Sequence, residues 1–287
     1  MSRPGDFEPN DLFVRSRSAL LDALEALAEH RECVVVIGAQ AIYLHTEGAA
    51  VALAEATKDS DLAIDPRHLN DAPLIEEAMT RAGFQLDAMK DQPGAWLNEA
   101  GIPVDLMVPE LLAGTGGRGA RAARLPPHGK RAMRRARGLE AAVVDYEVMS
   151  VSSLAADDER CFDVHVAGRA ALLIAKLHKI GERASDANPS RLIDKDAHDS
   201  YRLLVDSNTA DLAFDFGWLM EHELTAETAA EAVGHLADLF AAGADASGSE
   251  MAGRAETGVG EPATVALQTA ILAADLLAAV RRSRNPQ

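Results

Sequence analysis

The sequence predicts an α+β fold, in which a mixed sheet with flanking helices is followed by a helical C-terminal half. Short apolar, mostly β-branched runs such as residues 33–38 (CVVVIG) occur before residue 168 and are typical of buried strands. From residue 169 onward the apolar residues recur at helical spacing instead. Because strands come early and helices late, we expect a mixed lobe over residues 1–168 and a helical lobe over residues 169–287.

In the first lobe, helical and strand patterns are interspersed. Residues 14–30 carry leucines at helical spacing, and the glycine that ends the run at 33–38 is followed by a short helical pattern. Residues 96–98 and 102–108 indicate a hairpin. The helices expected here cover residues 14–30, 39–46 and 73–79, and the strands cover 33–38, 58–64, 96–98, 102–108, 143–148 and 162–166.

In the second lobe, the expected helices cover residues 170–183, 195–206, 226–242 and 264–282. Residues 243–262 are rich in glycine, alanine and polar side chains. Such composition is typical of linkers, so we expect a flexible loop there.

Composition excludes several classes of protein. The chain of 287 residues has 28 Lys+Arg against 45 Asp+Glu, a net charge of -17, so it does not bind duplex nucleic acid over its whole surface. Its two cysteines, Cys33 and Cys161, cannot build a disulfide framework or a cysteine-rich zinc site. The N-terminus has no apolar core and no apolar run reaches about 18 residues, so we expect a cytoplasmic protein with no membrane partner.

Three aspartates stand in or beside predicted strands. Asp59 and Asp61 are two residues apart, so a strand would place them on one face, and Asp105 lies within the apolar strand 102–108. Carboxylate oxygens are ligands of hard divalent cations such as Mg²⁺. An isolated pair of this spacing is common by chance, and two solvated carboxylates on an exposed strand are the alternative.

A strand, a glycine and a helix follow one another at Val36–Gln40. Gly38 permits close approach of the backbone, and a helix N-terminus attracts phosphate. Many turns from strand to helix carry a glycine for structural reasons alone. The order of strand, glycine, helix, aspartate pair and third aspartate resembles the nucleotidyltransferase fold of the polymerase-β type.

A later segment narrows this resemblance. Lys176 and Leu177 in a helix, Arg183 further along it, and the Lys195–Asp196…Asp199 motif are similar to the AbiEii family. These are nucleotidyltransferase-like toxins of bacterial toxin–antitoxin and phage-defence systems, with the mycobacterial MenT toxins as relatives. The resemblance covers about residues 33–206. Ala39 departs from the family, which has a glycine or serine after the first glycine.

The resemblance implies roles for particular residues. Asp59 and Asp61 would hold a Mg²⁺ or Mn²⁺ ion bound to the triphosphate of an NTP, and Asp105 would help to bind a second metal. Lys176 would contact the triphosphate, and Asp196 would orient that lysine or the nucleotide. The implied nucleotide-binding residues are Gly38, Ala39, Gln40, Thr57, Lys176 and Lys195.

A basic segment spans residues 118–137 in this acidic chain. An anionic acceptor such as a tRNA end could dock on it, while an unstructured basic loop or a patch for an acidic partner protein are the alternatives. A cognate antitoxin is a further partner that the family implies. The basic residues of the segment are Arg118, Arg121, Arg124, Lys130, Arg131, Arg134, Arg135 and Arg137.

Two other functions compete with the nucleotidyltransferase. One is a catalytically inactive binding or regulatory protein of the same fold, which Ala39 favours and the three aspartates oppose. The other is a metal-dependent phosphohydrolase of the HD class, built on His198 and Asp199. It would need His165 or His178 and a downstream acid such as Asp211. Among nucleotidyltransferases the acceptor could be tRNA, another RNA, a protein hydroxyl or a small molecule.

Overall fold

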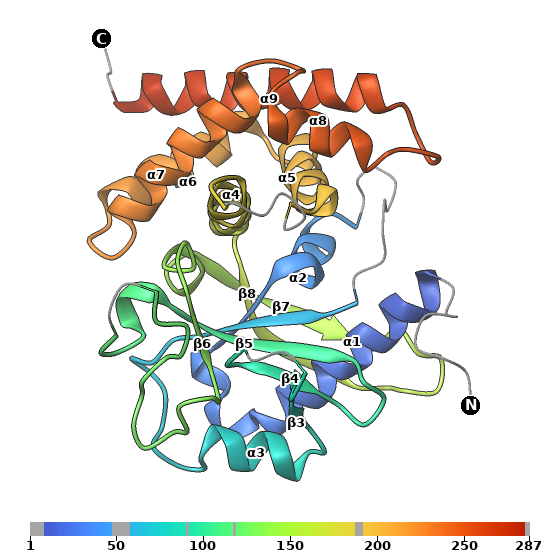
Figure 1. Ribbon diagram of the computed structural model, residues 1–287, viewed down its shortest axis with the longest axis vertical. Coiled ribbons are helices and arrows are strands. Elements are labelled where there is room, and N and C mark those ends of the chain that lie inside the picture. Colours follow the sequence, from blue (N-terminus) through green and yellow to red (C-terminus); the bar gives the residue numbers. More distant parts are fainter. Residues whose placement is uncertain (1–8, 48–57, 90–91, 117–118, 187–191, 285–287) are drawn as a thin grey trace. The chain divides into compact units, whose positions relative to one another are not determined.

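The computed structural model describes residues 9–47, 58–89, 92–116, 119–186 and 192–284 (Figure 1). The chain divides into two compact units. Unit 1 comprises Met1–Ala41, Ala56–Leu139 and Tyr146–Ala167. Unit 2 comprises Ile42–Glu55, Glu140–Asp145 and Gly168–Gln287. Of the described residues before 168, the ranges 42–47 and 140–145 are grouped with unit 2.

Unit 1 is built on one mixed sheet. Its strands lie in the order β3-β4-β5-β2-β1-β8-β7, and β6 also pairs with β5. The pairs β1–β8, β2–β5 and β5–β6 are parallel and the others are antiparallel. The strands are β1 (Val34–Ile37), β2 (Ser60–Ile64), β3 (Gln85–Leu86), β4 (Ala95–Leu97), β5 (Pro103–Pro109), β6 (Arg134–Ala136), β7 (Tyr146–Ser152) and β8 (Cys161–Ala167).

Helices flank this sheet. α1 (Pro9–Ala26) packs against β2 and β5 and contacts α3 (Ile75–Arg81), as Figure 1 shows on the lower side of the sheet. α2 (Gly38–His45) begins directly where β1 ends. Short 3-10 turns cover Ala28–Cys33, Glu110–Leu112 and Ala141–Val143. The apolar stripe of α1, which includes Leu20, Leu24 and Leu27, is buried, so the core of unit 1 lies between this helix and the sheet.

Unit 2 is helical. The long helix α9 packs against α6 and α8, and α4 packs against α5 and α7. The helices are α4 (Arg169–Ala184), α5 (Asp194–Asp206), α6 (Thr209–Glu221), α7 (Ala226–Leu236), α8 (Ser247–Arg254) and α9 (Pro262–Arg284), with a π-helical segment at Ala237–Ala241. The prediction of an α+β fold with a mixed sheet, flanking helices and a helical C-terminal half is confirmed.

The glycine-rich stretch at 243–262 differs from the prediction, because α8 lies within it. A Cβ on Gly248 would stand 2.7 Å from Phe240, and one on Gly253 would stand 2.5 Å from the carbonyl oxygen of Pro262. These glycines therefore allow close packing of a helix and do not loosen the chain. Composition alone could not separate the two uses of glycine.

Other differences concern single elements. α6 was not predicted, although its N-cap Asn208 accepts hydrogen bonds from the backbone of Ala210 and Asp211. The strand predicted at 143–148 begins only at Tyr146, because Ala141–Val143 form a 3-10 turn.

One helix in the described part of the chain is long and apolar enough to cross a membrane. It covers Pro262–Ser283 of α9, with a mean hydropathy of 1.8 in a window that is 44% buried. Since core helices pass the same test of length and composition, and α9 packs against its neighbours in unit 2, this finding is weak evidence for a membrane span.

Candidate active site

Two of the three predicted aspartates lie side by side on the sheet of unit 1. Asp61 of β2 and Asp105 of β5 are partners in the parallel register. Neighbouring strands are roughly 4.8 Å apart, and paired residues point to the same face. Ser60 faces α1, because its hydroxyl donates to the carbonyl of Ser16 at 2.9 Å. Asp61 and Asp105 therefore stand on the opposite face.

Gly38 adjoins this pair. Its neighbour Ile37 is the register partner of Asp61, and Gly38 itself has a φ of +68°. A Cβ at this position would overlap the carboxylate of Asp61. Both the left-handed backbone and the lack of space require glycine here. The turn predicted to approach a phosphate is thus packed directly against the carboxylate predicted to bind a metal.

A buried polar network holds Asp59 and the start of α2 on α1. The hydroxyl of Ser16 donates to the carbonyl of Asp59 at 3.0 Å and accepts from the Gln40 amide at 3.0 Å. Arg17 donates to the other end of the Gln40 side chain at 2.8 Å. Because both ends of this amide are bonded to α1, a nucleotide contact by Gln40 would fall to its backbone. Ala39 is buried, and Asp59 lies exposed just before β2.

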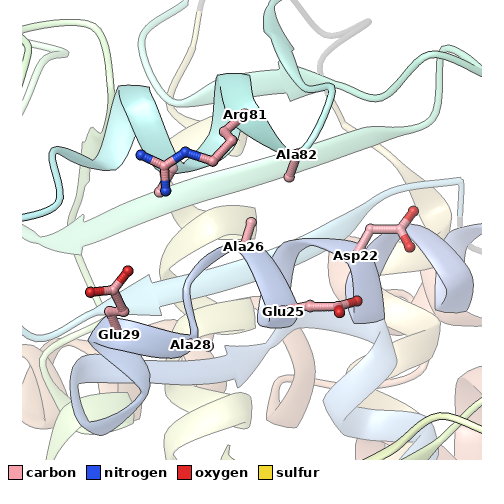
Figure 2. A pocket seen from close by; sticks show the side chains of 8 residues that line it. Asp22, Glu25, Ala26, Ala28, Glu29, Arg81 and Ala82 are labelled. Carbon is pink, nitrogen blue, oxygen red and sulfur yellow. The ribbon is translucent and has the colours of Figure 1, made fainter.

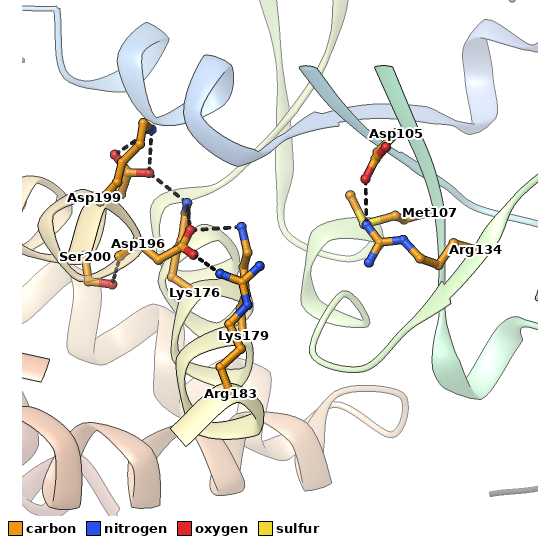
Figure 3. Close-up of polar contacts among 10 residues, drawn as sticks. Asp105, Met107, Arg134, Lys176, Lys179, Arg183, Asp196, Asp199 and Ser200 are labelled. Atoms are coloured by element: carbon orange, nitrogen blue, oxygen red, sulfur yellow. Dashed lines mark hydrogen bonds and ion pairs between the residues drawn. The ribbon is translucent and has the colours of Figure 1, made fainter. Parts of the chain in front are cut away.

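Asp105 is paired with a residue of the basic segment. Nη2 of Arg134 donates to Oδ2 of Asp105 at 2.9 Å and lies 2.9 Å from Sδ of Met107, as Figure 3 shows. The side chains of Arg134 and Asp105 are 26% and 16% exposed, so the pair is only partly screened by solvent. Arg134 was expected to bind an acceptor, whereas here it neutralises one of the candidate metal ligands.

The residues present allow a divalent metal only with help from a ligand. In the described part of the chain, no three His, Cys, Asp or Glu side chains gather as a metal site. Mg²⁺ in nucleotide enzymes commonly takes one or two carboxylates, with phosphates and waters completing the octahedron. The pair Asp61 and Asp105, with Asp59 just upstream, matches that donor chemistry.

The basic segment contains two kinds of arginine. Arg135 donates to the carbonyl of Gly114 at 2.6 Å, and Arg137 pairs with Glu110 at 3.2 Å. These two, together with Arg134, serve internal contacts. Solvent-exposed positions that could meet an anionic acceptor are Arg121, Arg124, Lys130 and Arg131. Two predicted site residues, Thr57 and Arg118, lie outside the described residues.

Unit 2 holds the remaining predicted residues in one buried charge network, also drawn in Figure 3. Nζ of Lys176 donates to Asp196 at 2.9 Å and to Asp199 at 2.7 Å. Asp196 also accepts from Lys179 at 2.9 Å and from Arg183 at 2.6 Å. Lys195 bonds Asp199 at 3.2 Å. Four cations thus share two carboxylates, which leaves an excess of positive charge in the network.

Burial makes this network electrostatically strong. Burial opposes the charged form of Lys176, but the carboxylates of Asp196 and Asp199 outweigh it and raise the pKa of the ammonium. Burial likewise acts to raise the pKa of Asp196, but Lys176 and Lys179 hold it well below its usual value. Lys176, Asp196 and Asp199 are therefore all charged at neutral pH. Lys176 is 8% exposed and Lys179 is 41% exposed, so Lys179 is the more accessible cation.

Sequence reasoning missed part of this network. Lys179 was not predicted. It lies three residues after Lys176, and Arg183 lies seven residues after Lys176, so all three share one face of α4. Tyr43 was also missed; the Lys195 ammonium lies 5.4 Å from its ring centroid. The first of these signals was readable from helical spacing, whereas the second required the fold.

Two histidines of the HD alternative, His198 and His178, have other partners. Nε2 of His198 lies 2.6 Å from Glu256, and Nε2 of His178 lies 2.8 Å from the carbonyl oxygen of Thr228. Asp199 is bonded to Lys176. Unit 2 therefore offers no HD-type ligand set in its described residues.

A cavity of about 400 Å³ in unit 1 lies elsewhere, between α1 and α3 (Figure 2). It contains none of the predicted site residues. It is lined by three carboxylates, one arginine and several alanines. Because the carboxylates outnumber the arginine, it attracts an anionic nucleotide little. The lining residues are Asp22, Glu25, Ala26, Ala28, Glu29, Ala78, Arg81 and Ala82.

Comparison with known proteins gives weak likenesses only. No protein-family model and no curated protein sequence matches the chain. Among solved structures, JHP933 from Helicobacter pylori is similar at 12% identity, with 94% of each chain covered and a TM-score of 0.40. A “putative nucleotidyltransferase from H. pylori” is similar at 12% identity, with 94% of this chain and 97% of that chain covered and a TM-score of 0.29. At these TM-scores neither likeness carries an argument, and the function is argued from the site.

Proposed function

We propose that this protein is a nucleotidyltransferase that moves an NMP group from an NTP to an acceptor hydroxyl. The observation that supports this most is the contact of the Gly38 turn with Asp61, beside Asp105 on the next strand. A phosphate-accepting turn and two carboxylates on one sheet face are what a metal–triphosphate complex needs.

Asp61 and Asp105, with Asp59, would hold Mg²⁺ or Mn²⁺. Such an ion, when bound, neutralises charge on the transferring phosphoryl group. The chain's own contribution is positioning: Gly38 lets the backbone approach the phosphates, and the Ser16 network fixes the backbone of Asp59. In unit 2, the excess of cations around Asp196 and Asp199 suits a polyphosphate, with Lys179 and Lys195 more exposed than Lys176.

RNA, and a tRNA end in particular, is the acceptor we propose. The support is the exposed cations of the basic segment in a chain of net charge -17, which would orient an anionic acceptor toward one surface. With the AbiEii resemblance, this makes the protein a cytoplasmic toxin of a toxin–antitoxin or phage-defence system, restrained by a cognate antitoxin.

The test is transfer of label from each α-labelled NTP to total RNA by the purified full-length chain with Mg²⁺. We expect transfer with at least one NTP and a loss on the order of 100-fold or more in Asp61→Asn, since even outer partners of metal ligands cost 10- to 100-fold when mutated. Asp163→Asn on β8 is the matched control, because Asp163 lies two strands from Asp61 and accepts a hydrogen bond from Ser150, which is not a predicted site residue. Equal transfer by both variants would refute the assignment.

One observation favours the second candidate, an inactive binding protein. The ion pair of Arg134 with Asp105 already satisfies an acid that an active enzyme would use for metal. The transfer assay and calorimetry together distinguish the two functions. An inactive protein would bind NTP in calorimetry but transfer no label to any RNA.

A further inference from the structure

Asp61 and Asp105 are two negative charges on neighbouring strands. Without a metal, another cation has to offset their repulsion. They are register partners on adjacent strands and point to the same face. Like charges in directly paired positions are destabilising. A cation between or beside them relieves the repulsion, and the structure places the guanidinium of Arg134 there, within 2.9 Å of Asp105.

The backbone of Arg134 is fixed on two sides. It pairs with Met107 of β5 in parallel register and with Ala122 in an antiparallel bridge. The amide of the next residue, Arg135, donates to the carbonyl of Arg121 at 2.8 Å. Arg134 is therefore not a loosely held surface arginine, since strand pairing sets where its side chain begins.

The contact itself is of a kind that can be exchanged. The contact runs from Nη2 of Arg134 to Oδ2 of Asp105, at the end of a long side chain. Nε of Arg134 is buried and has no hydrogen-bond partner in the described structure. Both side chains keep some exposure, 26% and 16%, so a dissolved cation can reach Asp105.

We propose that Arg134 is a tethered cation. It forms an ion pair with Asp105 while no metal is bound, and this ion pair breaks when a divalent ion binds beside Asp61. Arg134 is thus a positioning residue that competes with the metal. This inference rests on the proposed function, because it takes the Asp61–Asp105 face as the metal site.

The test is the affinity of the full-length protein for Mn²⁺ without nucleotide, measured by electron paramagnetic resonance of the free ion. Arg134→Gln and Arg134→Met remove the competing charge and should bind Mn²⁺ roughly three- to tenfold more tightly than the wild type, the range expected for a partly exposed ion pair. Arg137→Gln is the matched control. It removes the same charge from the same segment, but its partner is Glu110, so its affinity should stay at the wild-type value.

The outcomes separate this inference from the proposed function. The gain in Arg134→Gln should vanish when Asp61→Asn is added. If the two Arg134 variants bind no more tightly than the wild type while Asp61→Asn weakens binding, the tethered cation is wrong and the metal site stands. If Asp61→Asn leaves wild-type binding unchanged, the proposed site itself is wrong. Trp96 fluorescence checks folding, because its indole donates to the carbonyl of Ala132 next to β6.

Discussion

The acidic side chains of unit 1 and unit 2 are both paired with cations, but in different ways. In unit 1, Asp105 accepts a hydrogen bond from the partly exposed Arg134. In unit 2, Asp196 and Asp199 are 6% and 2% exposed and are bonded by four cations. Burial and the number of partners decide how readily a charge can exchange its counterion. We infer that Asp105 can exchange its cation for a metal, whereas the buried carboxylates Asp196 and Asp199 keep their cations.

The largest expected effect breaks the network of unit 2. Lys176→Met should destabilise it by about 3–5 kcal/mol, because two carboxylates stay buried after their shared partner is removed. Lys179→Met is the control; Lys179 also bonds Asp196 but is 41% exposed, so its loss should cost less than about 1 kcal/mol. Urea denaturation followed by far-ultraviolet circular dichroism measures both. Equal losses would show that burial does not distinguish these cations.

The next largest effect is a loss of stability from substitution in the Gly38 turn of unit 1. Gly38→Ala should cost about 1–2 kcal/mol from the left-handed backbone alone, and overlap with the Asp61 carboxylate adds to it. In the double variant with Asp61→Ala, the overlap with the carboxylate disappears, and the backbone cost remains together with a contact of 2.9 Å to the Cβ of residue 61. Denaturation of the two single variants and the double variant measures this coupling. Strict additivity would contradict the packing of Asp61 on Gly38.

The exposed arginines of the basic segment should affect RNA binding but not the stability of unit 1. Arg121→Gln with Arg124→Gln should lower the slope of log affinity against log salt by about 1.4 if both contact phosphates of single-stranded RNA, and should leave unit 1 stable. Arg135→Gln makes the contrast, because Arg135 bonds the carbonyl of Gly114 and its loss should disturb the loop. RNA binding at several salt concentrations, together with thermal melting, separates the two. An unchanged slope would exclude this surface as the acceptor site.

The smallest effect is a difference in pH dependence. Burial lowers the pKa of His128 below 6.5, and its Nδ1 accepts from the amide of Ile75 at 3.2 Å, which requires the neutral ring. Below pH 6.5 the unfolded chain takes up this proton first, so the stability of unit 1 should fall as pH drops through the lower, folded pKa. The pKa values of Asp196 and Asp199 are lowered from 3.8, so their contribution to unit 2 is lost only in stronger acid.

The two tryptophans allow this difference to be measured. Trp96 belongs to unit 1 and Trp218 to unit 2, and the chain has no others. In a Trp218→Phe background, Trp96 fluorescence should report a lower midpoint of urea unfolding at pH 5.5 than at pH 7.5. His128→Gln should reduce that difference. An identical change with His128 intact or replaced would assign the pH dependence to another group.

Local patterns predicted the parts of the fold that depend on neighbouring residues. The apolar run at 33–38, the hairpin at 96–108 and the helix from Arg169 are confirmed because burial and periodicity fix them within a few residues. The patterns placed Asp61 and Asp105 on strands, whereas their side-by-side position depends on the pairing of β2 with β5. The prediction of a flexible loop at 243–262 was wrong, because glycine permits tight helix packing as well as flexibility.

The partner of Asp105 could not be predicted in the same way. Arg134 is one of eight basic residues in its segment, and nothing local separates it from Arg131 or Arg135. Its role depends on the pairing of β6 with β5, which joins residues about thirty apart. Long-range strand pairing is the information that a single sequence read by pattern does not contain.

The central claim is that a metal–nucleotide complex binds at Gly38, Asp61 and Asp105. Nuclear magnetic resonance of the full-length protein with Mn²⁺ and a non-hydrolysable NTP analogue tests it most directly, because the ion broadens the signals of nearby amides. The account predicts that the amide signals of Gly38, Asp61 and Asp105 are lost first, while that of Asp163 persists. Loss of the Asp163 signal before these three, or no selective loss at all, would contradict it.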